Sequence, residues 1–144
     1  MTQNVTIIMI EDDEGHATLI EKNIRRAGIA NQIHHFRDGT SALEFLVNTP
    51  GGPLREGPTL ILLDLNLPDM SGTDILAIIK ADPELRRTPV VVLTTTDDRL
   101  EIERCYDLGC NVYITKPVNY ENFAAAIRQL GLFLSVITVA QPGA

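Results

Sequence analysis

The chain has 144 residues, of which 44% are hydrophobic and 22% are charged, as expected for a single globular domain. Its net charge of −7 argues against nucleic acid as a direct partner, because phosphate binding requires a basic face. The N-terminus lacks the layout of a signal peptide, and no apolar run approaches transmembrane length. Together with the presence of only two cysteines, these features predict a cytoplasmic protein without a membrane span.

Five apolar segments rich in β-branched residues predict strands, and a helical spacing of apolar residues follows each of them. The predicted strands are 5–10, 31–36, 59–64, 90–94 and 112–115. The helical patterns lie within 19–27, 42–46, 75–79, 100–108 and 123–134. Such alternation predicts right-handed crossovers and a parallel sheet that is covered on both faces. We therefore expect a doubly wound α/β fold with five parallel strands in the order 2-1-3-4-5, flanked by five helices.

Polar residues capable of chemistry stand at the ends of four of the five predicted strands. They are Glu11 and Asp12 after the first strand, Asp64 at the end of the third, Thr94 at the end of the fourth and Lys116 after the fifth. In this fold, ligands bind beyond the carboxyl ends of the strands, at the switch point between strands one and three. The residues at these ends therefore predict one shared site.

The residue types at this predicted site indicate its chemistry. Three crowded carboxylates cannot all remain ionised unless a cation compensates them, and oxygen ligands alone favour Mg²⁺. Lys116 offers a positive charge and Thr94 a hydroxyl donor, and both suit a phosphoryl group. Asp64 lies between the other acids and this pair, so it is the natural nucleophile and could form an acyl phosphate.

The motifs "IEDD", "LLDLNLPDMSG", "VVVLTT" and "YITKP" resemble, in order and spacing, those of receiver domains of two-component response regulators. The resemblance covers about residues 5 to 130, and it implies a flavodoxin-like phosphoacceptor domain at 1–130. It further implies that Asp64 takes phosphate from a sensor histidine kinase in a phosphorelay. Glu11, Asp12 and Asp64 would bind Mg²⁺, together with the backbone carbonyl of Asn66.

The same resemblance assigns roles to residues around the predicted site. Thr94 and Lys116 would contact the phosphoryl oxygens, and the Lys116–Pro117 peptide bond would be cis. Gly72, with Pro68, would shape the loop after the third strand. Tyr113 matches the aromatic residue that switches with Thr94, and this switch would remodel the face made by the fourth helix, the fifth strand and the fifth helix.

The segments "IKADPELRRTPVVVLTTTDD" and "CYDLGCNVYITKPVNYENF" look like a narrower group, the stand-alone regulators that partner bacterial phytochromes. As in that group, we expect no DNA-binding or enzymatic output segment after the receiver-like part. This resemblance implies a phytochrome-type histidine kinase as the partner and a signalling role rather than an enzymatic one.

The C-terminal segment 131–144 is apolar on more faces than one helix can bury against its own domain. We expect it to form a homodimer by packing on a second copy of the chain. The residues predicted at the dimer interface are Phe133, Leu134, Val136 and Ile137. Packing within the same chain is the alternative.

Two other functions use similar residues or the same topology. A Mg²⁺-dependent phosphatase would use the same aspartyl chemistry, but Asn66 stands two residues after Asp64, where such an enzyme needs an acid. A flavodoxin-like binding module would need a phosphate-binding loop after the first strand, where this chain has four acids. The histidines His16, His34 and His35 are expected to lie away from the site, in surface or packing roles.

Overall fold

The computed structural model describes residues 5–26, 28–48, 59–116, 121–122 and 125. Its sheet contains β1 (Thr6–Ile10), β2 (Ile33–Phe36), β3 (Thr59–Leu63), β4 (Val90–Thr94) and β5 (Val112–Thr115). Each neighbouring pair is parallel, and the order is β2-β1-β3-β4-β5. The predicted strand order and fold class are therefore confirmed.

Helices follow the strands as the apolar spacing predicts. They are α1 (Glu14–Arg26), α2 (Gly39–Leu43) with the π-helical continuation η1 (Glu44–Asn48), α4 (Gly72–Ala81) and α5 (Arg99–Leu108). Gly109, with a φ of 108°, ends α5, because its left-handed backbone suits a residue without a side chain. Most of the fifth predicted helix, within 123–134, lies outside the described residues.

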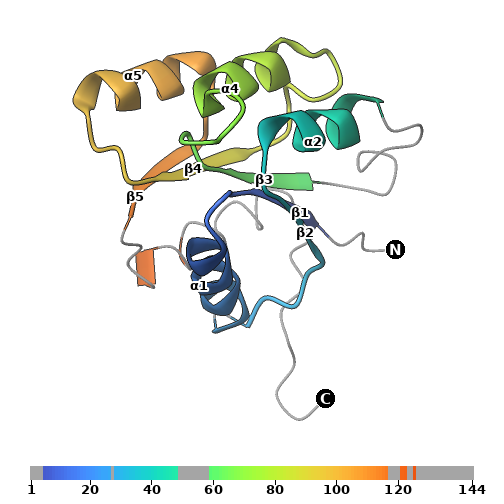
Figure 1. Ribbon diagram of the computed structural model, residues 1–144, viewed down its shortest axis with the longest axis vertical. Coiled ribbons are helices and arrows are strands. Elements are labelled where there is room, and N and C mark those ends of the chain that lie inside the picture. The colour runs from blue at the N-terminus through green and yellow to red at the C-terminus, as the bar shows by residue number, and fades with distance from the viewer. Residues whose placement is uncertain (1–4, 27, 49–58, 117–120, 123–124, 126–144) are drawn as a thin grey trace.

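The helices cover both faces of the sheet, which is why its central strands β1, β3 and β4 are almost entirely apolar and buried. In Figure 1, α1 lies on one side of the sheet, and α2, α4 and α5 lie on the other. Side chains alternate along each strand, so Ile7 and Met9 of β1 pack in the α1 layer, whereas Ile8 and Ile10 pack in the opposite layer. All four are almost fully buried. The buried central strands thus hold in place the polar residues that follow their carboxyl ends.

A close backbone contact holds the loop that follows β3. The Gly72 N–H donates to the Leu65 carbonyl at 2.9 Å. A Cβ atom at Gly72 would lie 2.4 Å from Leu65 Cα and 2.5 Å from the Asp64 carbonyl oxygen, so a side chain does not fit there. Gly72 therefore shapes this loop, as the family resemblance implies, and it lets α4 begin directly against the end of β3.

Several predictions concern residues beyond this description. Pro117, and with it the geometry of the Lys116–Pro117 bond, lies outside the described residues, as do Phe133, Leu134, Val136 and Ile137. Within the described part of the chain, no helix has the length and apolar character needed to span a membrane.

Candidate functional site

Asp64 and Lys116 each occupy the first position after a strand, and backbone hydrogen bonds extend the sheet to hold them there. The Asp64 N–H donates to the Ile10 carbonyl at 3.0 Å, and the Lys116 N–H donates to the Thr94 carbonyl at 2.8 Å. Glu11 follows β1 in the same way. Because the strands are parallel, these residues meet at one edge of the sheet, as the sequence predicts.

The three predicted metal ligands, Glu11, Asp12 and Asp64, form a compact cluster of carboxylates. One oxygen from each lies within 4.8 Å of the others. Glu11 and Asp64 are buried, whereas Asp12 is exposed at the mouth of the site. An all-oxygen group of this size, open to solvent on one side, suits a hard divalent cation that keeps some of its water ligands.

The buried position of Glu11 has an electrostatic consequence. Burial raises the pKa of Glu11 to about 7, the nearby Asp64 carboxylate adds to the increase, and the Lys116 ammonium opposes it. A raised pKa means that the negative charge on this carboxylate is incompletely compensated by the protein. The cluster is therefore prepared to exchange a proton for a cation.

Lys116 extends from the end of β5 into this cluster. Its ammonium contacts Glu11 Oε1 and lies 3.4 Å from Asp64 Oδ2. Only 6% of its side chain is exposed, so the pair is sheltered from water. The structure thus brings Lys116 together with the acids at the place where the sequence puts it.

One prediction about the histidines is wrong. His16 Nδ1 lies 3.1 Å from Lys116 Nζ, so His16 belongs to the site rather than to the surface. His35 also approaches it, with Nε2 2.7 Å from the Glu11 backbone carbonyl oxygen. His34, in contrast, packs against Phe45 with ring centroids 5.3 Å apart. The pattern of residues around His16 gave no signal, because its partner is 100 positions away in the sequence.

Asn66 connects Asp64 with the fourth strand, using its backbone N–H and its side chain. The Asn66 N–H donates to Asp64 Oδ1 at 3.1 Å, and its Nδ2 donates to Thr94 Oγ1 at 3.2 Å. Thr94 is fully buried. No pattern in the sequence indicates this contact between the Asn66 amide and Thr94. Asn66 thus contacts both Asp64 and the Thr94 hydroxyl.

Tyr113, the predicted switch residue, is anchored at both ends. Its hydroxyl donates to the Thr96 carbonyl at 2.6 Å, and its backbone N–H donates to the Tyr106 hydroxyl at 3.1 Å. Its ring packs, half-buried, against the core layer that contains Cys105. Tyr113 therefore connects α5 with the loop that follows β4, two residues beyond Thr94.

A surface hollow of about 550 Å³ opens beside the carboxylate cluster. It is lined by Asp12, Leu65, Asn66, Leu67, Pro68, Asp69, Met70 and Ser71. The loop after β3 thus forms one wall of an entrance that leads to the exposed carboxylate.

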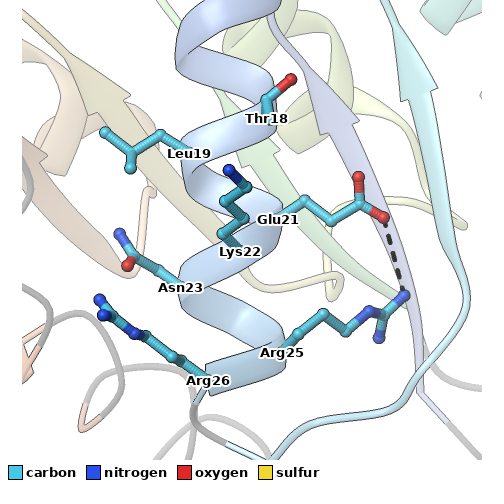
Figure 2. A pocket seen from close by; sticks show the side chains of 7 residues that line it. All are labelled: Thr18, Leu19, Glu21, Lys22, Asn23, Arg25 and Arg26. Atoms are coloured by element: carbon cyan, nitrogen blue, oxygen red, sulfur yellow. Dashed lines mark ion pairs between the residues drawn. The ribbon is translucent and has the colours of Figure 1, made fainter.

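A larger hollow, of about 830 Å³, lies on the outer face of α1 (Figure 2). Its charged side chains are mostly basic, and its acid, Glu21, is already 4.0 Å from Arg25 in an ion pair. Leu19 contributes an exposed apolar surface. This hollow contains no group of carboxylates comparable with the one at the sheet edge.

A family model for the response regulator receiver domain matches residues 7–128. The chain belongs to this family. Apart from Thr6 at the start of β1, the match includes every described strand and helix, and it includes all of the residues that form the carboxylate cluster. The sequence-based resemblance is therefore confirmed.

Similar proteins narrow this assignment. The chain is 67% identical to a response regulator receiver domain from Rhodospirillum rubrum, whose crystal structure matches with a TM-score of 0.76 over 94% of this chain and 96% of that one. It is 35% identical to response regulator Rcp1 of Synechocystis, over 92% of this chain and 91% of Rcp1. The Mn²⁺-bound form of Rcp1 matches with a TM-score of 0.72 and 33% identity, over 94% of this chain and 99% of that one.

A third relative has been solved in its phosphorylated form. This protein, the cyanobacterial phytochrome response regulator RcpA, is 35% identical, with a TM-score of 0.73 over 96% of this chain and 99% of that one. This receiver is therefore a relative of phytochrome response regulators, as its narrower sequence resemblance predicts. It spans nearly the whole length of these relatives.

Proposed function

We propose that this receiver accepts a phosphoryl group on Asp64 from a histidine kinase of the phytochrome type, in a reaction that requires Mg²⁺. The observation that carries the proposal is the meeting of Asp64 with two further carboxylates and the Lys116 ammonium at one edge of the sheet. The phosphorylated form of the related RcpA supports the phosphoacceptor role.

The proposed reaction is the transfer of a phosphoryl group from an imidazole nitrogen of the kinase to a carboxylate oxygen of Asp64. An Asp64 carboxylate oxygen forms a bond to phosphorus while the bond from phosphorus to the donor imidazole breaks, and the imidazole leaves with its electron pair. A carboxylate needs no general base for this step. Lys116, 3.4 Å from Asp64 Oδ2, would offset the charge of the phosphoryl oxygens. The Thr94 hydroxyl would donate a hydrogen bond to one of them.

Glu11, Asp12 and Asp64 would hold the cation, with the Asn66 carbonyl as a further ligand. Their oxygen-only donor set and the raised pKa of Glu11 fit a hard divalent ion. The related Rcp1 has been crystallised with Mn²⁺, which supports a divalent site of this kind. Bound Mg²⁺ would supply positive charge next to the anionic oxygens of the phosphoryl group.

The response to phosphorylation would pass through Thr94 and Tyr113. Thr94 would move toward the phosphoryl group, and Tyr113 would exchange its present position for an inward one. Its two anchors, on Thr96 and Tyr106, define the state from which this exchange starts. The surface of α5 and β5 would then change, together with the C-terminal segment that we propose as a dimer contact.

Acetyl phosphate with Mg²⁺, followed by intact-mass measurement, tests the phosphoacceptor role. One phosphate adduct is expected for the wild type and none for Asp64→Asn. Asp69→Asn serves as the control, because Asp69 follows the same strand but lies outside the carboxylate cluster. An adduct that survives in Asp64→Asn would contradict the assignment. Steady turnover of an external phosphoester by the wild type would favour the phosphatase alternative.

Two further measurements test the partners. Phosphotransfer from a labelled phytochrome-type kinase should be faster than from an unrelated histidine kinase, and equal rates would contradict the proposed pairing.

Sedimentation velocity of the intact chain should show a dimer. A monomer at tens of micromolar, with the tail present, would contradict the dimer formed through Phe133, Leu134, Val136 and Ile137.

A further inference from the structure

The contact between His16 and Lys116 brings an imidazole ring nitrogen to the ammonium group of the carboxylate cluster. His16 lies in the first turn of α1, and Lys116 follows β5 at the far end of the sequence. Their nitrogen atoms are 3.1 Å apart, which is hydrogen-bond distance. Nothing in the pattern of acids around Asp64 requires a histidine at this position.

The donor and acceptor roles in this contact follow from elementary chemistry. An ammonium group has three N–H donors and no acceptor, so His16 Nδ1 must be the acceptor. The ring then carries its proton on Nε2. The three ammonium donors have three partners in this structure, namely Glu11, Asp64 and His16.

Two of these three partners would change their role when the site works. In the proposed function, Glu11 would bind the cation and Asp64 would carry the phosphoryl group, so the charge that each presents to the ammonium changes. His16 carries no negative charge in this contact, and the proposed function gives it neither the cation nor the phosphoryl group to bind. It can therefore contact Lys116 both before and after phosphorylation.

We propose that His16 is a positioning residue that directs the Lys116 ammonium toward the phosphoryl group on Asp64. This inference rests on the proposed phosphoacceptor function. His16 acts through Lys116 and need not touch the phosphoryl group itself.

The backbone that carries His16 is well fixed. The His16 N–H donates to Asp13 Oδ1 at 2.9 Å, and this bond caps the start of α1. The following residues Ala17 and Ile20 are buried against the sheet. The ring therefore starts from a rigid first turn, so it can direct a long and flexible lysine side chain.

Three variants of the full chain separate positioning from packing. His16→Phe keeps a ring of similar size but removes the acceptor. His16→Asn places an amide oxygen near the position of Nδ1. Lys22→Ala is the matched control, because Lys22 is exposed on the same helix.

The first readout is the NMR signal of the lysine ammonium groups, assigned to Lys116 by its absence in Lys116→Met. A hydrogen-bonded and buried ammonium exchanges its protons slowly, so the signal should be visible in the wild type. It should broaden or disappear in His16→Phe and persist in both His16→Asn and Lys22→Ala. The ¹⁵N shifts of His16 in the wild type should show an unprotonated Nδ1. A purely structural role for His16 would leave the Lys116 signal unchanged in every folded variant.

The second readout is the rate of adduct formation with acetyl phosphate and Mg²⁺. His16→Phe should be slower by about tenfold, the scale of one hydrogen bond to a charged group, and His16→Asn should recover most of the loss. If His16→Phe does not fold, His16→Gln takes its place, because its amide reaches the Nε2 position and should not recover the rate.

Unchanged Lys116 signals and rates in His16→Phe, or in His16→Gln if that variant is used instead, would overturn the inference. A wild type that forms no adduct at all would overturn the proposed function, and this inference with it. The two failures are distinguishable, because the first leaves the Asp64 adduct intact.

Discussion

Asp69 and the carboxylate cluster both lie beyond the ends of strands, but their surroundings differ. Asp69 accepts hydrogen bonds from the backbone N–H groups of Gly39 and Thr40 and from the Thr40 hydroxyl, at the start of α2. These donors lower the pKa of Asp69 to about 2. Glu11, in the carboxylate cluster, is buried beside another acid, and its pKa is raised to about 7.

This difference in surroundings distinguishes an acid that stabilises the fold from acids whose charge is available to bind a cation. A carboxylate surrounded by N–H and O–H donors is already satisfied, so it holds its loop and helix in place. A carboxylate surrounded by other carboxylates is satisfied only when a cation arrives. Sequence position alone does not distinguish the two, since both follow apolar strands.

The largest expected effect concerns the binding of the cation. Asp12→Ala should weaken Mg²⁺ binding at least about tenfold, because changes to groups that merely support a metal ligand already cost that much. Glu14→Ala should leave the affinity unchanged, because Glu14 is exposed and pairs with Arg37. Isothermal titration of both variants measures the difference. Equal losses of Mg²⁺ affinity in the two variants would show that both acids attract the cation only by their charge, and that Asp12 is not a ligand.

The second prediction is a pH dependence that arises from Glu11. Its pKa is raised from 4.5 in an ordinary chain to about 7 in the fold, so the folded protein holds this proton more tightly. In EDTA, the corresponding stability is present below about pH 4.5 and is lost as the pH rises through about 7. Glu11→Gln should remove this part of the curve. Parallel melting-temperature profiles for wild type and Glu11→Gln would contradict the prediction.

The third prediction concerns Asp69, whose carboxylate accepts hydrogen bonds from the start of α2. Asp69→Ala should lower the melting temperature by a few degrees, because two backbone N–H groups at the start of α2 lose their acceptor. Mg²⁺ affinity should be preserved. Glu84→Ala, an exposed acid elsewhere on the surface, is the control for the loss of one charge. A loss of Mg²⁺ binding in Asp69→Ala would remove the distinction between the two groups of acids.

The smallest effect should appear at low pH and has the opposite sign to that of Glu11. The pKa of Asp69 is lowered from 3.8 to about 2, so its contribution to stability is present above pH 3.8 and is lost as the pH falls through about 2. The difference in melting temperature between wild type and Asp69→Ala should therefore shrink in this range. A constant difference would show that Asp69 acts by packing rather than through its charge.

The sequence predicted the fold and the carboxylate cluster for the same physical reason. Parallel strands bring their carboxyl ends together, so residues such as Asp64 and Lys116 must meet whatever lies between them. The cap that Asp13 provides for α1 is local, because its Oδ1 accepts from the N–H of His16, three residues on. Contacts of His16 and of the Asn66 amide depend instead on how a helix sits on the sheet and on side-chain rotamers, which no local pattern specifies.

The hydroxyl of Tyr106 has a consequence for the association of the protein with other chains. Strand β5 is last in the sheet order, so an unprotected N–H on its outer side would be a template for another strand. The N–H of Tyr113 in β5 donates instead to the hydroxyl of Tyr106, which belongs to α5. This contact blocks the addition of a strand in the middle of β5, and it favours partners that bind through side chains rather than by extending the sheet.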